Sequence, residues 1–268
     1  MFYYTAFYAF AYFMILLPQQ WIKHGNLHQL ATIEFWVKAI AFIGIIGVAA
    51  GFSYHHDFLR YIQDLGAGLN AGERYYLGKI GSNTKRLLLY IPLLVFIRYW
   101  YDRHTNGLYG LSAKGFDYKP YVVMMLIMFP LIMAASFLPD FLRQYPSFKV
   151  WRNPDLFGWN DWQLLLVYEL SYAMAFFFVE LIFRGALTIG MERVLKSDAI
   201  LPMVAVYCFL HFGKPLGETI SSIFGGYIIG VIALYSRSIL GGCFIHIGIA
   251  LTMDITAMIQ HYFLGRGN

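Results

Sequence analysis

The sequence predicts an all-α membrane protein, a polytopic bundle of about eight spanning helices. Its 268 residues are 59% hydrophobic and only 13% charged, against roughly 25% charged residues in globular domains, and the mean hydropathy is +0.56. Apolar stretches that suit a bilayer crossing recur along the whole chain. This composition excludes a soluble globular enzyme, a disordered chain and a coiled coil.

Short polar connections separate the predicted spans. In chain order, the spans cover residues 2–17, 35–54, 87–101, 121–138, 163–183, 199–212, 219–236 and 238–262. The first lacks the basic region and cleavage site of a secretory signal, and we interpret it as a span. The third is the weakest, and the connection 55–86 before it has the pattern of an interfacial amphipathic helix. We expect residues 1–158 to supply spans that do not fold separately, and residues 159–262 to form a four-helix core that carries the functional site.

The net charge of +5 comes from basic residues that are scattered through the connections without forming a stripe. This distribution is typical of lysines and arginines that face anionic lipid, so we expect the lipid bilayer as a partner and no nucleic acid. The two cysteines, Cys208 and Cys243, lie in apolar runs and are interpreted as buried thiols.

Ionisable residues interrupt the apolar runs toward the end of the chain. A charge inside the bilayer costs roughly 2.5–3.5 kcal/mol on the insertion scale, so such residues need partners or a polar cavity. Glu180 and Arg184 stand one helical turn apart, which predicts that the guanidinium pairs with the carboxylate. His211 and His246 lie in two further spans. Glu169 is about 16 Å from Glu180 along the same helix and cannot share its proton.

Lys214 and Glu218 follow His211 at a helix break, and Asp254 follows His246. Taken singly, each polar group has a structural explanation, as a satisfied interior histidine, an ion pair between helices, or a cap on a helix end. Taken together, ionisable groups on consecutive helices favour a buried polar site. The seventh span also has small residues at four-residue spacing, which indicate close helix packing: Ser222, Gly226 and Gly230.

A buried carboxylate and an imidazole can together deprotonate and orient a water, while a second imidazole hydrogen-bonds the oxyanion of an attacked amide. The pattern therefore indicates hydrolysis within the bilayer. The sequence contains neither Gly-x-Ser-x-Gly nor His-Glu-x-x-His, the signatures of serine hydrolases and zincins. Glu180, His211 and His246 resemble a zinc ligand set. Zinc therefore stays open as an alternative that their wide separation in sequence does not favour, and we expect no cofactor.

The motifs Glu180-x-x-x-Arg184, Tyr207-x-x-x-His211 and His246 resemble those of the CAAX protease and bacteriocin-processing family, over about residues 160–256. This family includes the Ras-converting prenyl-protein endopeptidase and the Abi proteins. The resemblance implies an all-helical bundle of about eight spans that encloses a water-accessible cavity. It also implies glutamate-dependent intramembrane endoproteolysis.

Three positions depart from the family pattern. The second motif of the family is Phe-x-x-x-His, and Tyr207 replaces its phenylalanine, a mild aromatic exchange. The first motif of the family is Glu-Glu-x-x-x-Arg, and its first glutamate, the usual base, is replaced by Val179. The third motif is His-x-x-x-Asn or Asp, and Ala250 stands at its end. Lys214, Glu218 and Asp254 are candidate replacements, Glu218 as a base and the other two as groups that orient the intermediate.

The leading hypothesis is an intramembrane endopeptidase that cleaves a membrane-associated protein or peptide. Glu180, supported by Arg184, would act with His211 on a water, and His246 would stabilise the oxyanion. The alternative is a non-catalytic family member with an immunity, scaffold or regulatory role, because Val179 replaces the usual base. A third class, an ion-coupled transporter, lacks the matched pair of interrupted segments that marks an inverted repeat. The compact connections favour a bacterial cell membrane.

Overall fold

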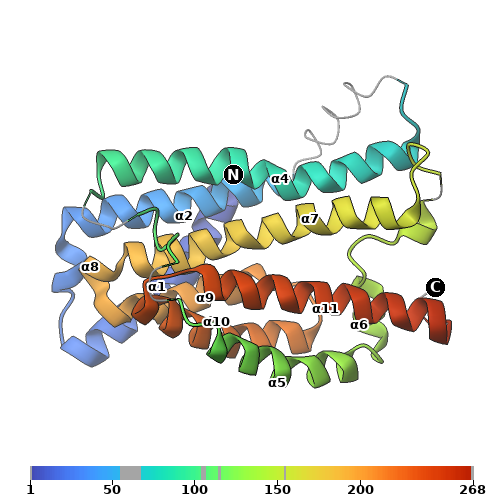
Figure 1. The fold of residues 1–268 in the computed structure, drawn as a ribbon. Coiled ribbons are helices and arrows are strands. Elements are labelled where there is room, and N and C mark those ends of the chain that lie inside the picture. The colour runs from blue at the N-terminus through green and yellow to red at the C-terminus, as the bar shows by residue number, and fades with distance from the viewer. Residues whose placement is uncertain (1, 55–67, 104–106, 114–115, 154, 267–268) are drawn as a thin grey trace. The chain divides into compact units, whose positions relative to one another are not determined.

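The computed structural model describes residues 2–54, 68–103, 107–113, 116–153 and 155–266, and these residues form helices and connections without any strand. Figure 1 traces the helices in order along the chain. The longer ones are α1 (Phe2–His24), α2 (Ile33–Tyr54), α4 (Ala71–Trp100), α5 (Lys119–Ala135), α7 (Asp161–Glu180), η3 (Leu181–Gly190), α9 (Ile200–Leu210), α10 (Leu216–Ser236) and α11 (Leu240–Leu264). Short helical segments occupy several connections: η1 (His28–Ala31), α6 (Pro139–Gln144), η2 (Val150–Arg152), α8 (Glu192–Leu195) and η4 (Lys196–Ala199).

Five helical stretches of the described chain are long and apolar enough to cross a membrane, and α5 is a shorter apolar helix. The spans are 33–51, 71–100, 161–210, 216–236 and 240–264. The predicted all-helical membrane bundle is therefore confirmed. The stretch 161–210 contains α7, η3 and α9 as separate helices, with α8 and η4 between η3 and α9, so the two spans predicted there correspond to different helices. The hydrophobic residues of the predicted interfacial helix lie in 55–67, outside the described residues, while 71–86 forms the first half of α4.

The chain divides into two compact units that are each assembled from separate stretches. The first unit comprises residues 1–54, 87–117 and 178–243, and the second comprises 55–86, 118–177 and 244–268. Helices α4, α7 and α11 each contribute residues to both units. The predicted division of the chain near residue 158 remains a prediction.

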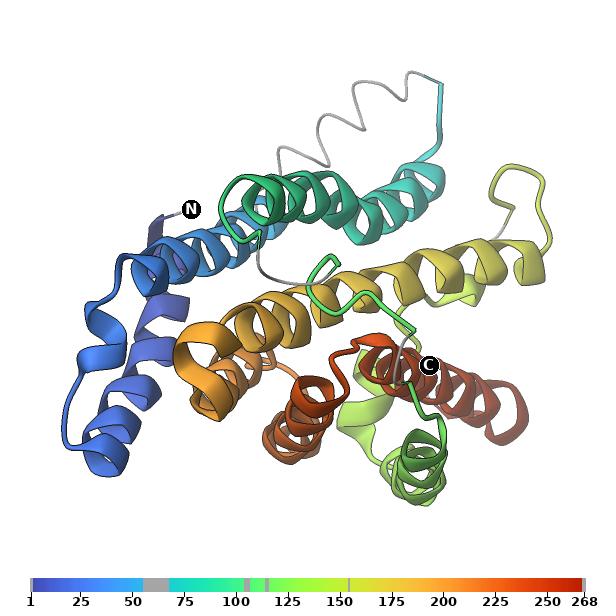
Figure 2. The same cartoon turned by 60° about the vertical axis from the view of Figure 1, so that its left-hand side comes forward.

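In the first unit, α1 packs against α2 and α9, and α10 packs against α9 and η3; Figure 2 shows α1 and α2 as neighbouring helices joined by a short connection. The small residues of α10 make its approach to α9 possible. A Cβ atom at Gly226 would lie 3.0 Å from Cδ1 of Tyr207, and one at Gly230 would lie 2.7 Å from Cε of Met203. The predicted packing role of this stripe is thus confirmed.

A fully buried lysine joins three elements of the first unit. Lys38 of α2 donates to the carbonyl of Gly190 at 2.8 Å and pairs with Glu34 and Asp102, each at 3.0 Å. Because Lys38 is fully buried, this set of contacts satisfies all three ammonium hydrogens. It fixes the end of η3 to α2 and to the end of α4.

Asp198 makes a second buried connection, between η4 and the end of α1. Its carboxylate accepts from Gln20 at 3.0 Å and from His24 at 2.7 Å, and it pairs with Lys23. The carboxylate is almost fully buried. A buried carboxylate needs such partners, so it holds the C-terminal turn of α1 in place.

The second unit has its own core, built on aromatic side chains. Tyr76, Phe148 and Tyr168 are buried together with Val150, Leu156 and Leu164. The hydroxyl of Tyr76 donates to the carbonyl of Leu164 at 2.7 Å. This cluster joins α4, α7 and the connection between α5 and α7.

Candidate active site

Glu180 and Arg184 form a buried ion pair at the junction of α7 and η3. Both residues have 0% exposure, and Nη1 of Arg184 donates to Oε1 of Glu180 at 2.8 Å. The pairing predicted from their spacing is confirmed. The bond fixes the direction of the carboxylate, because a charge-assisted hydrogen bond between two buried groups is strong and directional. Val179, at the position of the family's usual base, is also buried.

The residues directly after Glu180 form a π-helix rather than an α-helix. All ten residues of η3 are buried, and the hydroxyl of Thr188 donates to the carbonyl of Phe183 at 2.9 Å. Such segments are rare and are often found at functional sites. The π-helix changes the helical register after Glu180, so a regular α-helical wheel does not describe the positions that follow.

Tyr207 lies between Arg184 and His211. The guanidinium carbon of Arg184 is 4.4 Å from the centre of the Tyr207 ring, and the ring centres of Tyr207 and His211 are 4.5 Å apart. Both Tyr207 and His211 are buried. Arg184 lies over the face of the Tyr207 ring, which stabilises the buried cation. The imidazole of His211 meets the same ring in an edge-to-face contact.

His211 is oriented by the backbone of its own helix. Its Nδ1 lies 2.8 Å from the carbonyl oxygen of Tyr207. A carbonyl oxygen can only accept, so we assign the hydrogen of a neutral ring to Nδ1 and the lone pair to Nε2. This orientation by a backbone carbonyl is a common way to set the tautomer of a functional histidine.

The backbone of α11 approaches the Glu180 carboxylate closely at Gly242. A Cβ atom at this position would lie 2.1 Å from Oε2 of Glu180 and 3.1 Å from Cγ2 of Ile229. Only a glycine leaves room for the carboxylate here. The next residue, Cys243, is a free and buried thiol, as the sequence predicts.

A connecting segment of the first unit packs against η3. Tyr109 is fully buried, and its carbonyl oxygen would lie 2.8 Å from a Cβ atom at Gly185. Gly110, with φ +82°, accepts a hydrogen bond from the backbone of Ile239 at 2.9 Å. Burial raises the pKa of the Tyr109 hydroxyl, and the nearby Asp102 raises it further. The hydroxyl of Tyr109 therefore stays protonated, and the backbone of Tyr109 packs against the π-helix η3.

Lys214 and Glu218 pair with each other where α9 turns into α10. Gly213 has φ +91°, a conformation that favours glycine and allows the turn. The hydroxyl of Thr219 donates to the carbonyl of His211 at 2.9 Å, which connects the start of α10 to the end of α9. Lys214 and Glu218 therefore support the turn that follows His211, and their roles in catalysis remain predictions.

His246 and Asp254 lie in the second unit. The ring of His246 is 4.5 Å from that of Phe176. Both oxygens of Asp254 are 3.1 Å from the backbone nitrogen of Ser147, whose hydroxyl donates to Oδ1. Asp254 thus holds the connection that follows α6. This is a structural role of the kind that the sequence offers for Asp254, a group that hydrogen-bonds the end of a helix. Within the described ranges, no three His, Cys, Asp or Glu side chains are grouped so as to hold a metal ion.

The comparisons with known proteins point to the same part of the chain. Residues 161–252 match the model of a family described as type II CAAX prenyl endopeptidase Rce1-like. Over this stretch, about a third of the chain, the sequence is similar to the CAAX protease family. No curated protein and no solved structure matches the chain. Together with its apolar helices, the match supports an integral membrane protein.

The CAAX protease segment contains Glu180, Arg184, His211 and His246, whereas Asp254 lies just beyond it. Gly242 is a site residue that the sequence analysis did not identify. The Gly-Gly pair at the start of α11 was the available signal, but its meaning depends on the close approach of the Glu180 carboxylate. Tyr207 was noted only as a motif residue, and its position between a cation and a histidine follows from the packing of α9 against η3.

Proposed function

We propose that this CAAX protease family member is an intramembrane endopeptidase that hydrolyses a peptide bond of a membrane-associated protein or peptide. The observation that carries the proposal is the buried ion pair of Glu180 and Arg184, linked through Tyr207 to His211. A buried ion pair is a costly way to stabilise a fold, and its position in the protease-family segment favours a functional role.

In the proposed mechanism, Glu180 accepts a proton from the attacking water. Arg184 fixes one carboxylate oxygen, so the other is directed toward the backbone at Gly242. Nε2 of His211 can accept a hydrogen bond from the same water, because Nδ1 is engaged with the backbone. His246 is assigned to the oxyanion by its motif position alone, as the family resemblance implies.

The substrate class follows from the location of these groups within membrane spans. A peptide bond can reach them only in a chain that is itself inserted into the bilayer or attached to it. We propose a bacterial cell membrane as the location, on the basis of the compact connections.

The test is a quantitative analysis of new peptide termini in membranes of cells that carry the protein or a variant at equal abundance. Glu180→Ala and His211→Ala should each abolish a common set of termini. His28→Ala is the matched control, because His28 is an exposed residue of η1. Termini that persist in Glu180→Ala membranes would refute the assigned role of Glu180.

A second candidate function is a non-catalytic membrane protein with an immunity, scaffold or regulatory role. The observation that favours it is Val179, a buried aliphatic residue where the family has its usual base. It predicts that His211→Ala rescues the phenotype of a null strain with unchanged termini. It further predicts that Val179→Glu creates termini absent from wild-type membranes.

A further inference from the structure

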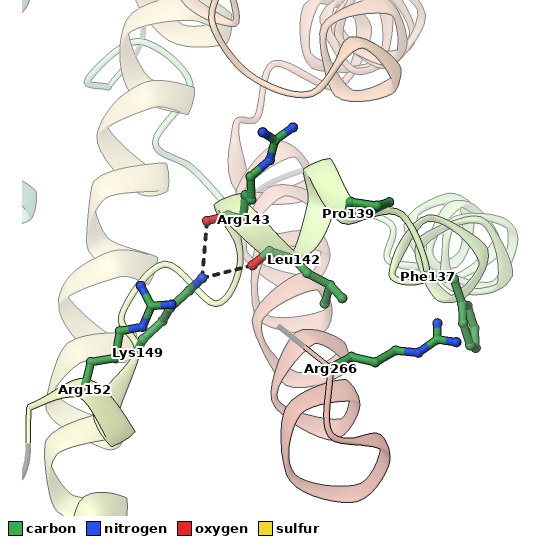
Figure 3. A pocket seen from close by; sticks show the side chains of 7 residues that line it. All are labelled: Phe137, Pro139, Leu142, Arg143, Lys149, Arg152 and Arg266. Carbon is green, nitrogen blue, oxygen red and sulfur yellow. Dashed lines mark hydrogen bonds between the residues drawn. The ribbon is translucent and has the colours of Figure 1, made fainter. Parts of the chain in front are cut away.

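A basic cavity in the second unit is not used by the proposed reaction. It has a volume of about 580 Å³, within the usual range for small-molecule sites. Figure 3 shows four basic side chains around it, together with three apolar ones. The lining residues are Phe137, Pro139, Leu142, Arg143, Lys149, Arg152 and Arg266. None of these described lining residues is acidic.

The cavity lies where apolar helices of the second unit end. Its walls come from the connection after α5, from α6 and η2, and from the residue Arg266 that follows α11. Large apolar side chains near these helix ends are exposed, including Phe137 at 50%, Leu138 at 58% and Phe263 at 81%. Helix ends of this kind lie at the level of lipid headgroups.

The basic groups are held in place, and they leave charge available to a ligand. Lys149 donates to the carbonyls of Leu142 at 2.9 Å and Arg143 at 3.3 Å, as the dashed lines of Figure 3 show. An ammonium group has a third hydrogen to offer. Burial lowers the pKa of Lys149, and the charge of Arg152 lowers it further. An anion bound in the cavity would stabilise the charged form of Lys149.

Arg152 and Arg266 have different surroundings from Arg143. Arg143 pairs with Asp140 and is exposed, so its charge is already compensated. The guanidinium of Arg266 lies over the ring of Phe137, 5.2 Å from its centre. Arg152 is exposed beside Lys149. Arginine and lysine together provide the donors that a phosphate group requires.

We infer that this cavity binds the phosphate of an anionic phospholipid headgroup, with Lys149, Arg152 and Arg266 as donors. The exposed apolar side chains beside the cavity favour an amphiphile over free phosphate. The acyl chains would follow Phe137, Leu138 and Phe263 along the ends of the helices. Basic cavities between membrane helices are a known chemistry for headgroup recognition.

The experiment compares the full-length protein in neutral detergent with phosphatidylglycerol, phosphatidylcholine and inorganic phosphate, with bound lipid counted by native mass spectrometry. Phosphatidylglycerol should bind in preference to phosphatidylcholine, and inorganic phosphate should not displace it at equal concentration. Equal binding of the two lipids would overturn the inference. Displacement by inorganic phosphate at equal concentration would overturn the lipid assignment and indicate a simple anion site.

The variant Arg152→Gln/Arg266→Gln should lower the affinity for phosphatidylglycerol about 30-fold, since each basic group near the surface contributes roughly a factor of five. Arg103→Gln/Arg193→Gln is the matched control, because it removes two exposed arginines that do not line the cavity. Equal loss in the two variants would contradict a defined site. The wild-type lipid comparison decides the question even where a variant fails to fold.

Discussion

The close approach of α11 to Glu180 leads to a prediction that can be worked out in atomic terms. In Gly242→Ala, the added Cβ atom would lie 2.1 Å from Oε2 of Glu180 and 2.9 Å from its Cδ. The tightest Cβ contacts of real proteins are 3.0–3.4 Å. The carboxylate therefore has to move by roughly 1 Å, a displacement sufficient to disrupt a hydrogen bond.

This displacement acts on a group that is enclosed by the protein. Glu180 is fully buried, and its other oxygen is held by Arg184 at 2.8 Å. Overpacking of a well-packed interior costs about 1–3 kcal/mol, and we expect Gly242→Ala to destabilise the protein by this amount. We also expect a loss of cleavage of about 100-fold, because a misplacement of 1 Å at a reacting group has this effect.

The assay is chemical unfolding of the purified protein in detergent, applied as a double-mutant cycle with Glu180→Ala. Glu180→Ala alone should cost about 3–5 kcal/mol, because it leaves Arg184 buried without its carboxylate. In that background the clash with the carboxylate is absent, so Gly242→Ala should cost much less. Gly225→Ala in α10 is the control, because a Cβ atom there meets nothing within 4 Å, and it should be neutral or slightly stabilising.

Strict additivity of the two substitutions would refute the reasoning. It would mean that the cost of Gly242→Ala arises elsewhere, and that the carboxylate does not approach the backbone of α11. The cycle measures this contact alone, so its result is independent of whether Glu180 is catalytic.

Three further predictions concern the framework around the site. Lys38→Met should lower the free energy of unfolding by about 3–5 kcal/mol, because it leaves Asp102 buried without its cation. In unfolding experiments, Lys38→Met/Asp102→Leu should recover much of this loss, and no recovery would contradict the pairing. Tyr207→Leu should be less stable to unfolding than Tyr207→Phe by about 0.5–2 kcal/mol, since only Tyr207→Phe keeps a ring under Arg184. Equal stability would mean that the contact between the cation and the ring contributes nothing. Asp198→Ala should cost about 1–3 kcal/mol and speed proteolytic cleavage at the end of α1, whereas an unchanged cleavage rate would show that other contacts hold this turn.

The sequence predicted those features that depend on composition and on neighbours along one helix. Hydropathy predicted the helical membrane bundle, and the spacing of Glu180 and Arg184 predicted their ion pair. The small residues of α10 predicted close packing, because their effect depends only on the absence of side-chain volume. The predicted spans 163–183 and 199–212 correspond to different helices, α7 with η3 and α9, whereas the short helices α8 and η4 between them were not predicted.

The remaining features depend on groups that are distant along the chain. Gly242 becomes significant only because a carboxylate from α7 lies against it, and Lys38 only because Asp102 and the carbonyl of Gly190 meet it. The π-helix was not predictable, because the reading of helices from the sequence assumes an α-helical period and shows no change of register within 181–190. Asp254 was considered for the active site, but its partner Ser147 lies in a connection whose path the sequence does not specify.

The contacts of Lys38 also have a consequence for how the protein is made. Glu34 lies in the same helix as Lys38, but the carbonyl of Gly190 is 152 residues further along the chain. At about 5–20 residues per second, synthesis of that stretch takes roughly 8–30 s. Asp102 follows Lys38 by 64 residues (102 − 38), so it is made before Gly190, but until then α2 carries a lysine with neither of its later partners. A charge in the bilayer costs roughly 2.5–3.5 kcal/mol. Glu34 is the partner available from the start, so it serves the nascent chain before it serves the folded protein.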